Sequence, residues 1–113
     1  MLVFIAKIIW RFSRGIYYAP IGPTGKVTLS LKLSEMVGKY SANSQILKLA
    51  KSTNPKYSAY GAVIVFQYRR KLIEKYRQDL NMRSETVFLR GYSYEFQTPL
   101  KFTFETLEGD VSI

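Results

Sequence analysis

The sequence has no cysteine and no histidine among its 113 residues. Without these side chains the protein cannot form a disulfide, a thiolate nucleophile, a Cys/His zinc site or an imidazole acid–base pair. Only the chemistry of carboxylate, Lys, Tyr and Ser side chains remains, so most classes of enzyme are excluded. The absence of thiols also removes the usual indication of redox compartment.

Acidic residues are scarce as well, since 8 Asp and Glu stand against 17 Lys and Arg and give a net charge of +9. Residues 1–84 include 15 basic and 3 acidic residues, whereas residues 85–113 include 2 basic and 5 acidic ones. A strongly basic surface attracts phosphate polyanions or anionic lipid. The carboxylates offer no pair poised for acid–base catalysis, so we expect a protein that is not an enzyme and uses no cofactor or metal.

The length fits a single domain spanning residues 1–113, and the hydrophobic content of 47% predicts a packed core. No repeat, low-complexity tract or long linker divides the chain. Strand-like and helix-like patterns both occur along it. Together they predict an α+β fold, in which an antiparallel β-sheet carries two or three helices on one face.

The N-terminal segment, residues 1–14, is strongly apolar but is interrupted by Lys7 and Arg11. It is too short and too charged to span a bilayer. No cationic region precedes it and no cleavage site follows it, so no cleavable signal peptide is expected. These features favour a location inside a cell or a virion.

Two structures fit this apolar segment. An amphipathic helix would place Lys7, Arg11 and Arg14 on one face, with Trp10 beside them, ready to contact an anionic membrane or a protein partner. A core strand would place alternate apolar side chains on one face and the cations on the other. The core interpretation is favoured, because apolar segments of small domains are usually buried.

Prolines and glycines crowd residues 17–26 and predict an ordered turn. Within it, residues 22–26 resemble a phosphate-binding loop only superficially, because the first glycine and the hydroxyl residue after the lysine are missing. Residues 27–33 alternate apolar and polar side chains, which predicts a strand. Short helices are then expected from Glu35 and from residues 41–44, the second ending at Asn54 and Pro55.

Residues 59–65 carry no charge and fit either a strand or a helix, with the β-branched residues 63–65 slightly favouring a strand. From about residue 66 to residue 81 an amphipathic helix is predicted, because apolar residues recur every three or four positions. The candidate nucleic-acid site consists of the cations on this helix and the arginine just after it: Arg69, Arg70, Lys71, Lys75, Arg77 and Arg83. Lys48 and Lys51 are further candidate contacts.

The side chains of this helix allow two different roles. Tyr68 and Tyr76 would add stacking if the partner were single-stranded. Alternatively, the cations would form an ordinary solvated face with the ion pairs Arg70–Glu74 and Lys75–Asp79.

A β-hairpin is predicted at about residues 86–106, with a turn at residues 97–99 and a ladder of aromatic side chains. The acidic residues 105–113 are expected to fray, although they could instead dock on the basic surface of a neighbouring copy. The nine tyrosines would suit either a sheet or an interface; those expected in loops or strands are Tyr17, Tyr18, Tyr57, Tyr60, Tyr92 and Tyr94.

The sequence therefore favours a non-enzymatic basic protein that binds nucleic acid through phosphates, with low specificity. The alternative is a small structural or assembly protein, such as a viral matrix or capsid component or a subunit of a larger complex. Such a protein would form a homo-oligomer and contact an anionic membrane surface.

Overall fold

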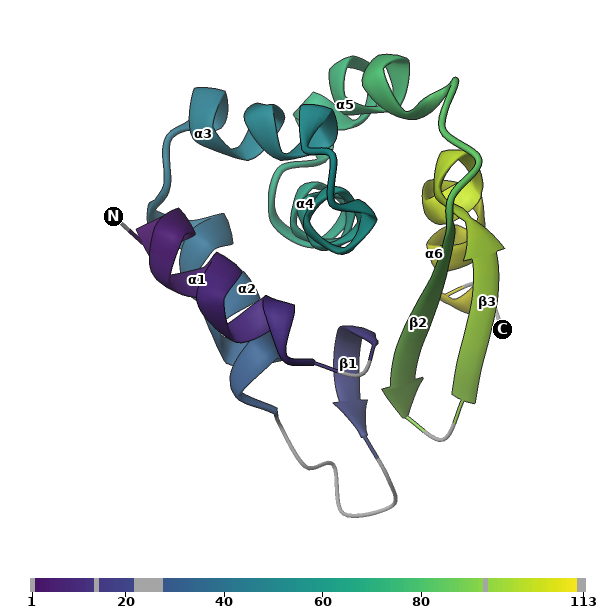
Figure 1. Cartoon of the computed structure of the whole chain (residues 1–113), viewed down its shortest axis with the longest axis horizontal. Coiled ribbons are helices and arrows are strands. Elements are labelled where there is room, and N and C mark those ends of the chain that lie inside the picture. The colour runs from purple at the N-terminus through teal and green to yellow at the C-terminus, as the bar shows by residue number, and fades with distance from the viewer. Residues whose placement is uncertain (1, 14, 22–27, 93, 112–113) are drawn as a thin grey trace.

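The chain folds around one buried helix. The computed structural model describes residues 2–13, 15–21, 28–92 and 94–111. The elements in chain order, with η for 3₁₀ turns, are α1 (Leu2–Arg11), β1 (Ile16–Ile21), α2 (Leu29–Tyr40), α3 (Asn43–Lys48), η1 (Leu49–Lys51), α4 (Pro55–Tyr68), η2 (Arg70–Leu72), α5 (Ile73–Leu80), β2 (Thr86–Tyr92), β3 (Tyr94–Pro99), η3 (Leu100–Phe102) and α6 (Thr103–Val111). In Figure 1, α4 is seen nearly end-on, with α1 and α2 to one side and the sheet to the other.

The central helix α4 contains the uncharged residues 59–65, which the sequence left between strand and helix. Residues 58–66 are buried around the whole circumference of the helix. An all-round apolar helix has no polar stripe, so hydrophobic periodicity could not distinguish it from a buried strand. Asn54 begins the helix, because its side chain accepts a hydrogen bond from the backbone N–H of Lys56.

The strand predicted at residues 27–33 and the helix start predicted at Glu35 are both wrong, since α2 runs from Leu29 to Tyr40. Thr28 caps this helix by accepting a hydrogen bond from the backbone N–H of Leu31 at 3.1 Å. Ser30 and Ser34 are buried with the leucines, and the Ser34 hydroxyl donates to the Ser30 carbonyl at 2.9 Å. The alternating pattern was therefore misleading, because the polar residues include serines that the helix backbone satisfies inside the core.

The predicted continuous helix at about residues 66–81 is also wrong. α4 ends at Tyr68, and Arg69 leaves the helical conformation with φ −137° and ψ 54°. The chain then forms η2 and turns into α5, which packs beside η1 on another side of α4. The apolar spacing continued across this break because both helices bury one face against the same core.

The sheet has the order β1-β2-β3. β1 pairs with β2 in parallel and β2 pairs with β3 antiparallel. Residues 17–21 belong to β1, so the turn predicted at residues 17–26 is wrong for this part of the chain. The α+β class is thus confirmed, but the sheet is mixed rather than antiparallel, because β1 comes from a distant part of the chain. The packing of helices on one face of the sheet stays a prediction.

β2 and β3 form a hairpin within the predicted residues 86–106, but the predicted turn at residues 97–99 is wrong, because these residues belong to β3 and pair with β2. The predicted ladder of aromatic side chains is also wrong, since Phe102 lies in η3 and Phe104 in α6. The chain continues into η3 and α6 instead of a longer strand, and the Thr103 hydroxyl donates to the Leu100 carbonyl at 2.7 Å. Phe104 and Leu107, three residues apart, are buried. Residues 105–111 therefore belong to α6 rather than to a frayed terminus, and residues 112–113 lie outside the described residues.

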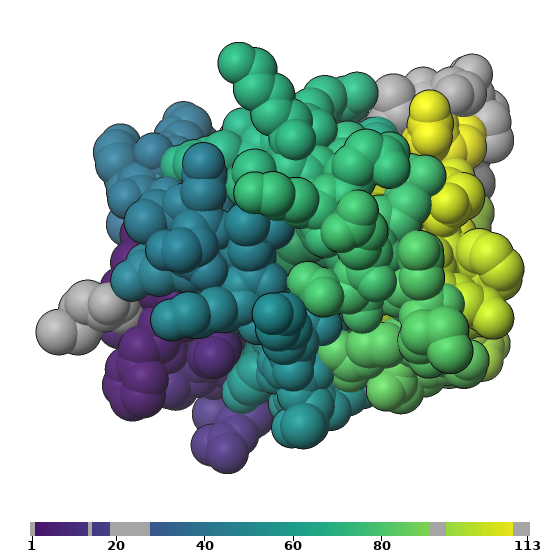
Figure 2. All heavy atoms as spheres, turned by 90° about the horizontal axis from the view of Figure 1, so that it is seen from above, coloured from purple at the N-terminus to yellow at the C-terminus, as the bar shows by residue number. Residues whose placement is uncertain are grey.

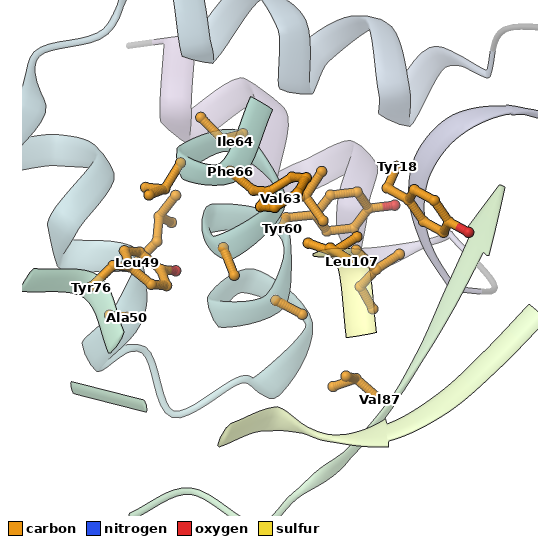
Figure 3. Close-up of a cluster of buried hydrophobic side chains, with 14 of the residues drawn as sticks. Tyr18, Leu49, Ala50, Tyr60, Val63, Ile64, Phe66, Tyr76, Val87 and Leu107 are labelled. Atoms are coloured by element: carbon orange, nitrogen blue, oxygen red, sulfur yellow. The ribbon is translucent and has the colours of Figure 1, made fainter. Parts of the chain in front are cut away.

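One hydrophobic core connects these elements (Figure 3). Trp10 of α1 stacks on Tyr60 of α4, with ring centroids 4.6 Å apart and ring planes 7° from parallel. Tyr60 and Tyr57 belong to α4, so the expectation that they lie in a loop or strand is wrong. In the described part of the chain, no helix is long and apolar enough to cross a membrane.

Candidate nucleic-acid interface

Exposed cations gather where α3 and η1 lie beside η2 and α5. Figure 2 views this side from above and shows the teal α3 and η1 segment next to the green α5 segment. We call this surface the basic face and define it by five exposed residues from both segments: Lys48, Lys51, Arg70, Lys71 and Lys75. Lysines and arginines from two distant parts of the sequence are thus combined into one positive surface.

The first half of the basic face is an open hollow of about 450 Å³ between α3 and α5. Lys48 and Lys51 line it from one side, and Lys75 and Asp79 line it from the other. Three ammonium groups against one carboxylate leave this hollow positive. It can therefore accept an anionic group such as a phosphate.

The second half is a hollow of about 470 Å³ at the junction of α4 and η2, and Arg70 and Lys71 line it together with Tyr68. The Arg70 guanidinium lies 4.6 Å from the centre of the Phe66 ring, which orients it by a cation–π contact. The side-chain amides of Asn43 and Gln67 complete the lining. Aromatic, cationic and amide groups thus occur together in one hollow.

Arg69 and Arg83, two of the predicted phosphate ligands, are bound within the protein instead. Arg69 donates to the carbonyls of Gly38 and Ser41, each at 2.9 Å, and so satisfies the C-terminal end of α2. Arg83 donates to the Ala50 carbonyl at 3.0 Å and to the Ser52 carbonyl at 2.7 Å, at the end of η1. Both guanidinium groups stabilise helix ends, where carbonyl groups lack partners within the helix.

Arg83 also faces Glu85, with Nε and a carboxylate oxygen 3.2 Å apart. A hydrogen bond from the Glu85 backbone N–H lowers the pKa of this carboxyl group below its usual value, and the hydrogen bond from the Arg83 side chain lowers it further. Arg83 is therefore partly neutralised as well as occupied.

Arg77 points away from the basic face toward α6. Its guanidinium lies 5.6 Å from the centre of the Phe104 ring and 3.8 Å from a Glu105 carboxylate oxygen. Neither of the two ion pairs expected along this helix, Arg70–Glu74 and Lys75–Asp79, is among the ion pairs of the described residues. The cations of the basic face are thus free of the expected neutralisation.

The tyrosines expected to stack on bases differ in accessibility. Tyr76 is fully buried, and its hydroxyl donates to the Ser58 carbonyl. Burial raises the pKa of this phenol well above its usual value of 10.0. Only Tyr68 of the pair reaches the surface of the second hollow.

The four candidate contact residues of the N-terminal segment do not share one exposed surface in the described part of the chain. Residues 2–11 form a helix, so the core strand is wrong, but Trp10 is completely buried in the core. The Lys7 ammonium lies 5.6 Å from the Tyr57 ring centre, and Arg11 is exposed. Arg14 and the loop-like residues 22–26 lie outside the described residues.

Sequence reasoning missed Asn43 and Gln67, because isolated amides carry no periodic or charge signal. It named Lys48 and Lys51 only as additional contacts, since their distance from Lys75 in sequence hides their proximity in space. Among the residues that the structure describes, no group of three or more acidic side chains could hold a metal ion. Comparisons with protein family models, curated proteins and solved structures found no match for this chain.

Proposed function

We propose that the protein is a non-enzymatic binding protein that holds nucleic acid through its phosphates on the basic face. The observation that carries this proposal is the convergence of Lys48 from α3, Lys51 from η1 and Lys75 from α5 on one hollow. Lysine ammonium groups bind phosphate oxygens as point charges and do not read base sequence. Affinity should therefore depend strongly on salt and weakly on sequence.

The second hollow supports a preference for single strands. Tyr68 is 36% exposed and lines this hollow beside Arg70 and Lys71, so we expect a base to stack on its ring while the cations hold the adjacent phosphates. Asn43 and Gln67 also line this hollow, but the Asn43 side-chain oxygen accepts from Arg69 and the Gln67 amide donates to the Tyr18 carbonyl, so both are already held within the protein. Because a paired base cannot stack in this way, a single strand should bind more tightly than a duplex of equal charge density.

The test is fluorescence anisotropy with a labelled single strand and a labelled duplex, each measured over a series of salt concentrations. Replacing Lys48→Gln together with Lys75→Gln should weaken binding at every sequence and reduce the salt slope by about one unit for each lysine. The matched control replaces Lys32→Gln and Lys101→Gln, which removes the same charge from α2 and η3. The control should retain most of the wild-type affinity.

Light scattering on the same samples separates this function from the alternative of a structural or assembly protein. No binding at low salt, combined with a discrete oligomer, would contradict nucleic-acid binding and favour assembly. Equal losses in the two double variants would show that net charge, rather than the basic face, attracts the strand. Arg70→Glu with Lys71→Glu should abolish binding and leave any self-association intact.

A further inference from the structure

Helix α1 and Phe12, which directly follows it, expose a row of large apolar side chains. Phe4 is 64% exposed, Ile8 44% and Phe12 77%, and these residues recur every four positions. Ile5, also 44% exposed, lies beside them on the helix surface. We call these four residues the apolar stripe. The opposite side of α1 carries Ala6 and Trp10 into the core, so the fold itself directs the stripe toward solvent.

Cations border the apolar stripe. Lys7 follows Phe4 by three residues and Arg11 follows Ile8 by three, so both lie along one edge of the stripe. The first acidic residue of the sequence is Glu35. The whole region up to that point, including α1, is therefore free of negative charge.

We propose that the apolar stripe of α1 inserts into the surface of an anionic membrane, with Lys7 and Arg11 at the level of the lipid headgroups. A helix that lies in the membrane interface buries an apolar face among the acyl chains and pairs its basic residues with anionic headgroups. The phenylalanine and isoleucine side chains supply the first requirement and the bordering cations the second. This surface is separate from the basic face, so the inference does not depend on nucleic-acid binding.

Charge favours a membrane over a second copy of the chain as the occupant. A symmetric dimer through α1 would bring Lys7 and Arg11 of one copy close to those of the other, with no carboxylate on either helix to pair with them. An anionic lipid surface instead complements these cations and also the net charge of +9. The arrangement differs from the expected one, because Trp10 lies in the core and Phe4 and Phe12 replace it as anchors.

Sedimentation with vesicles tests the insertion. The wild-type chain should bind vesicles of phosphatidylserine and phosphatidylcholine more tightly than vesicles of phosphatidylcholine alone. Replacing Phe4→Ser and Phe12→Ser should reduce the partition coefficient about tenfold for each phenylalanine. The control is Met82→Ser, which removes a 91% exposed apolar side chain beyond the end of α5. This control should bind like wild type, and circular dichroism should show that all variants fold.

A fluorescent label separates insertion from electrostatic adsorption. Because the chain has no cysteine, Phe12→Cys creates a unique site for a polarity-sensitive dye. The dye emission should shift to the blue when anionic vesicles are added, whereas the same dye on Met82→Cys should not shift. Vesicle binding without a shift at residue 12, or binding that survives the loss of both phenylalanines, would overturn the proposal. A dimer that dissociates in the Phe4→Ser and Phe12→Ser variant, without vesicle binding by wild type, would assign the stripe to a second copy and also overturn it.

Discussion

The guanidinium of Arg83 joins three segments of the chain. It donates to carbonyls at the end of η1 and to the Ser58 hydroxyl in α4, the latter at 2.7 Å. Ser58 is itself buried and donates to the Leu49 carbonyl at 2.9 Å. The exposed Lys75 has none of these contacts, although both side chains belong to the same basic run of the sequence. At the residue scale, burial and hydrogen bonding therefore separate structural cations from available ones.

Replacing Arg83→Ala should lower the free energy of unfolding by about 2–3 kcal/mol, because buried acceptors lose a charged donor. Urea denaturation followed by circular dichroism measures this change. The control Lys75→Ala removes an exposed cation and should change stability by less than about 0.5 kcal/mol. Equal stability of the two variants would contradict the structural role of Arg83.

At the element scale, two glycines allow neighbouring helices to pack closely against the central helix α4. Gly61 of α4 faces Tyr76 and Leu49, and a Cβ added there would lie 2.8 Å from the Leu49 Cβ. Gly38 of α2 faces Tyr68, and an added Cβ would lie 2.7 Å from the Tyr68 Cγ. These glycines allow α5, η1 and α2 to approach α4, which brings Lys48 and Lys51 close to Lys75.

Replacing Gly61→Ala should destabilise the protein by about 1–3 kcal/mol, since the added methyl group overlaps well-packed atoms in the core. Gly109 in α6 provides the matched control, because a Cβ added there meets no atom within 4 Å. Gly109→Ala should stabilise the helix by about 0.5–1 kcal/mol through its higher helix propensity. Thermal unfolding of both variants measures the two effects, and a stabilising Gly61→Ala would show that α4 and η1 are less closely packed.

At the scale of the whole molecule, the buried tyrosine phenols should make the stability of the fold decrease as the pH rises above about 10. Burial raises the pKa of Tyr60 and, more strongly, that of Tyr76 above the usual value of 10.0. Below pH 10 both the folded and the unfolded chain keep these protons, so stability is fully present. As the pH rises further, the unfolded chain loses them first, and unfolding becomes more favourable.

Stability should therefore fall by up to about 1.4 kcal/mol per pH unit for each buried phenol above pH ~10. Denaturant titrations at several alkaline pH values measure this slope. Tyr76→Phe should reduce the slope, whereas Tyr40→Phe, which changes an exposed phenol, should leave it unchanged. An unchanged slope in Tyr76→Phe would show that Tyr76 ionises without unfolding.

The sequence by itself determined the chemistry and several boundaries. Missing histidine and cysteine excluded thiol and imidazole sites, and the excess of lysine and arginine set the sign of the surface. Asn54 and Pro55 marked a helix boundary, although they begin α4 rather than only ending the preceding helix. The pattern after residue 86 indicated a hairpin, and β2 and β3 form one, but alternation at residues 100–104 was misleading because these residues are helical.

The sequence pattern left open the secondary structure of some segments and the roles of individual cations, and only the tertiary structure decided them. Residues 59–65 are helical because neighbours surround α4 on all sides, and such a helix has no amphipathic period. Phe104 and Leu107 continue a helix because α4 and β3 lie within reach of α6. The roles of the cations depend on which carbonyls and carboxylates come close in space, and that proximity is fixed by packing between residues distant in sequence.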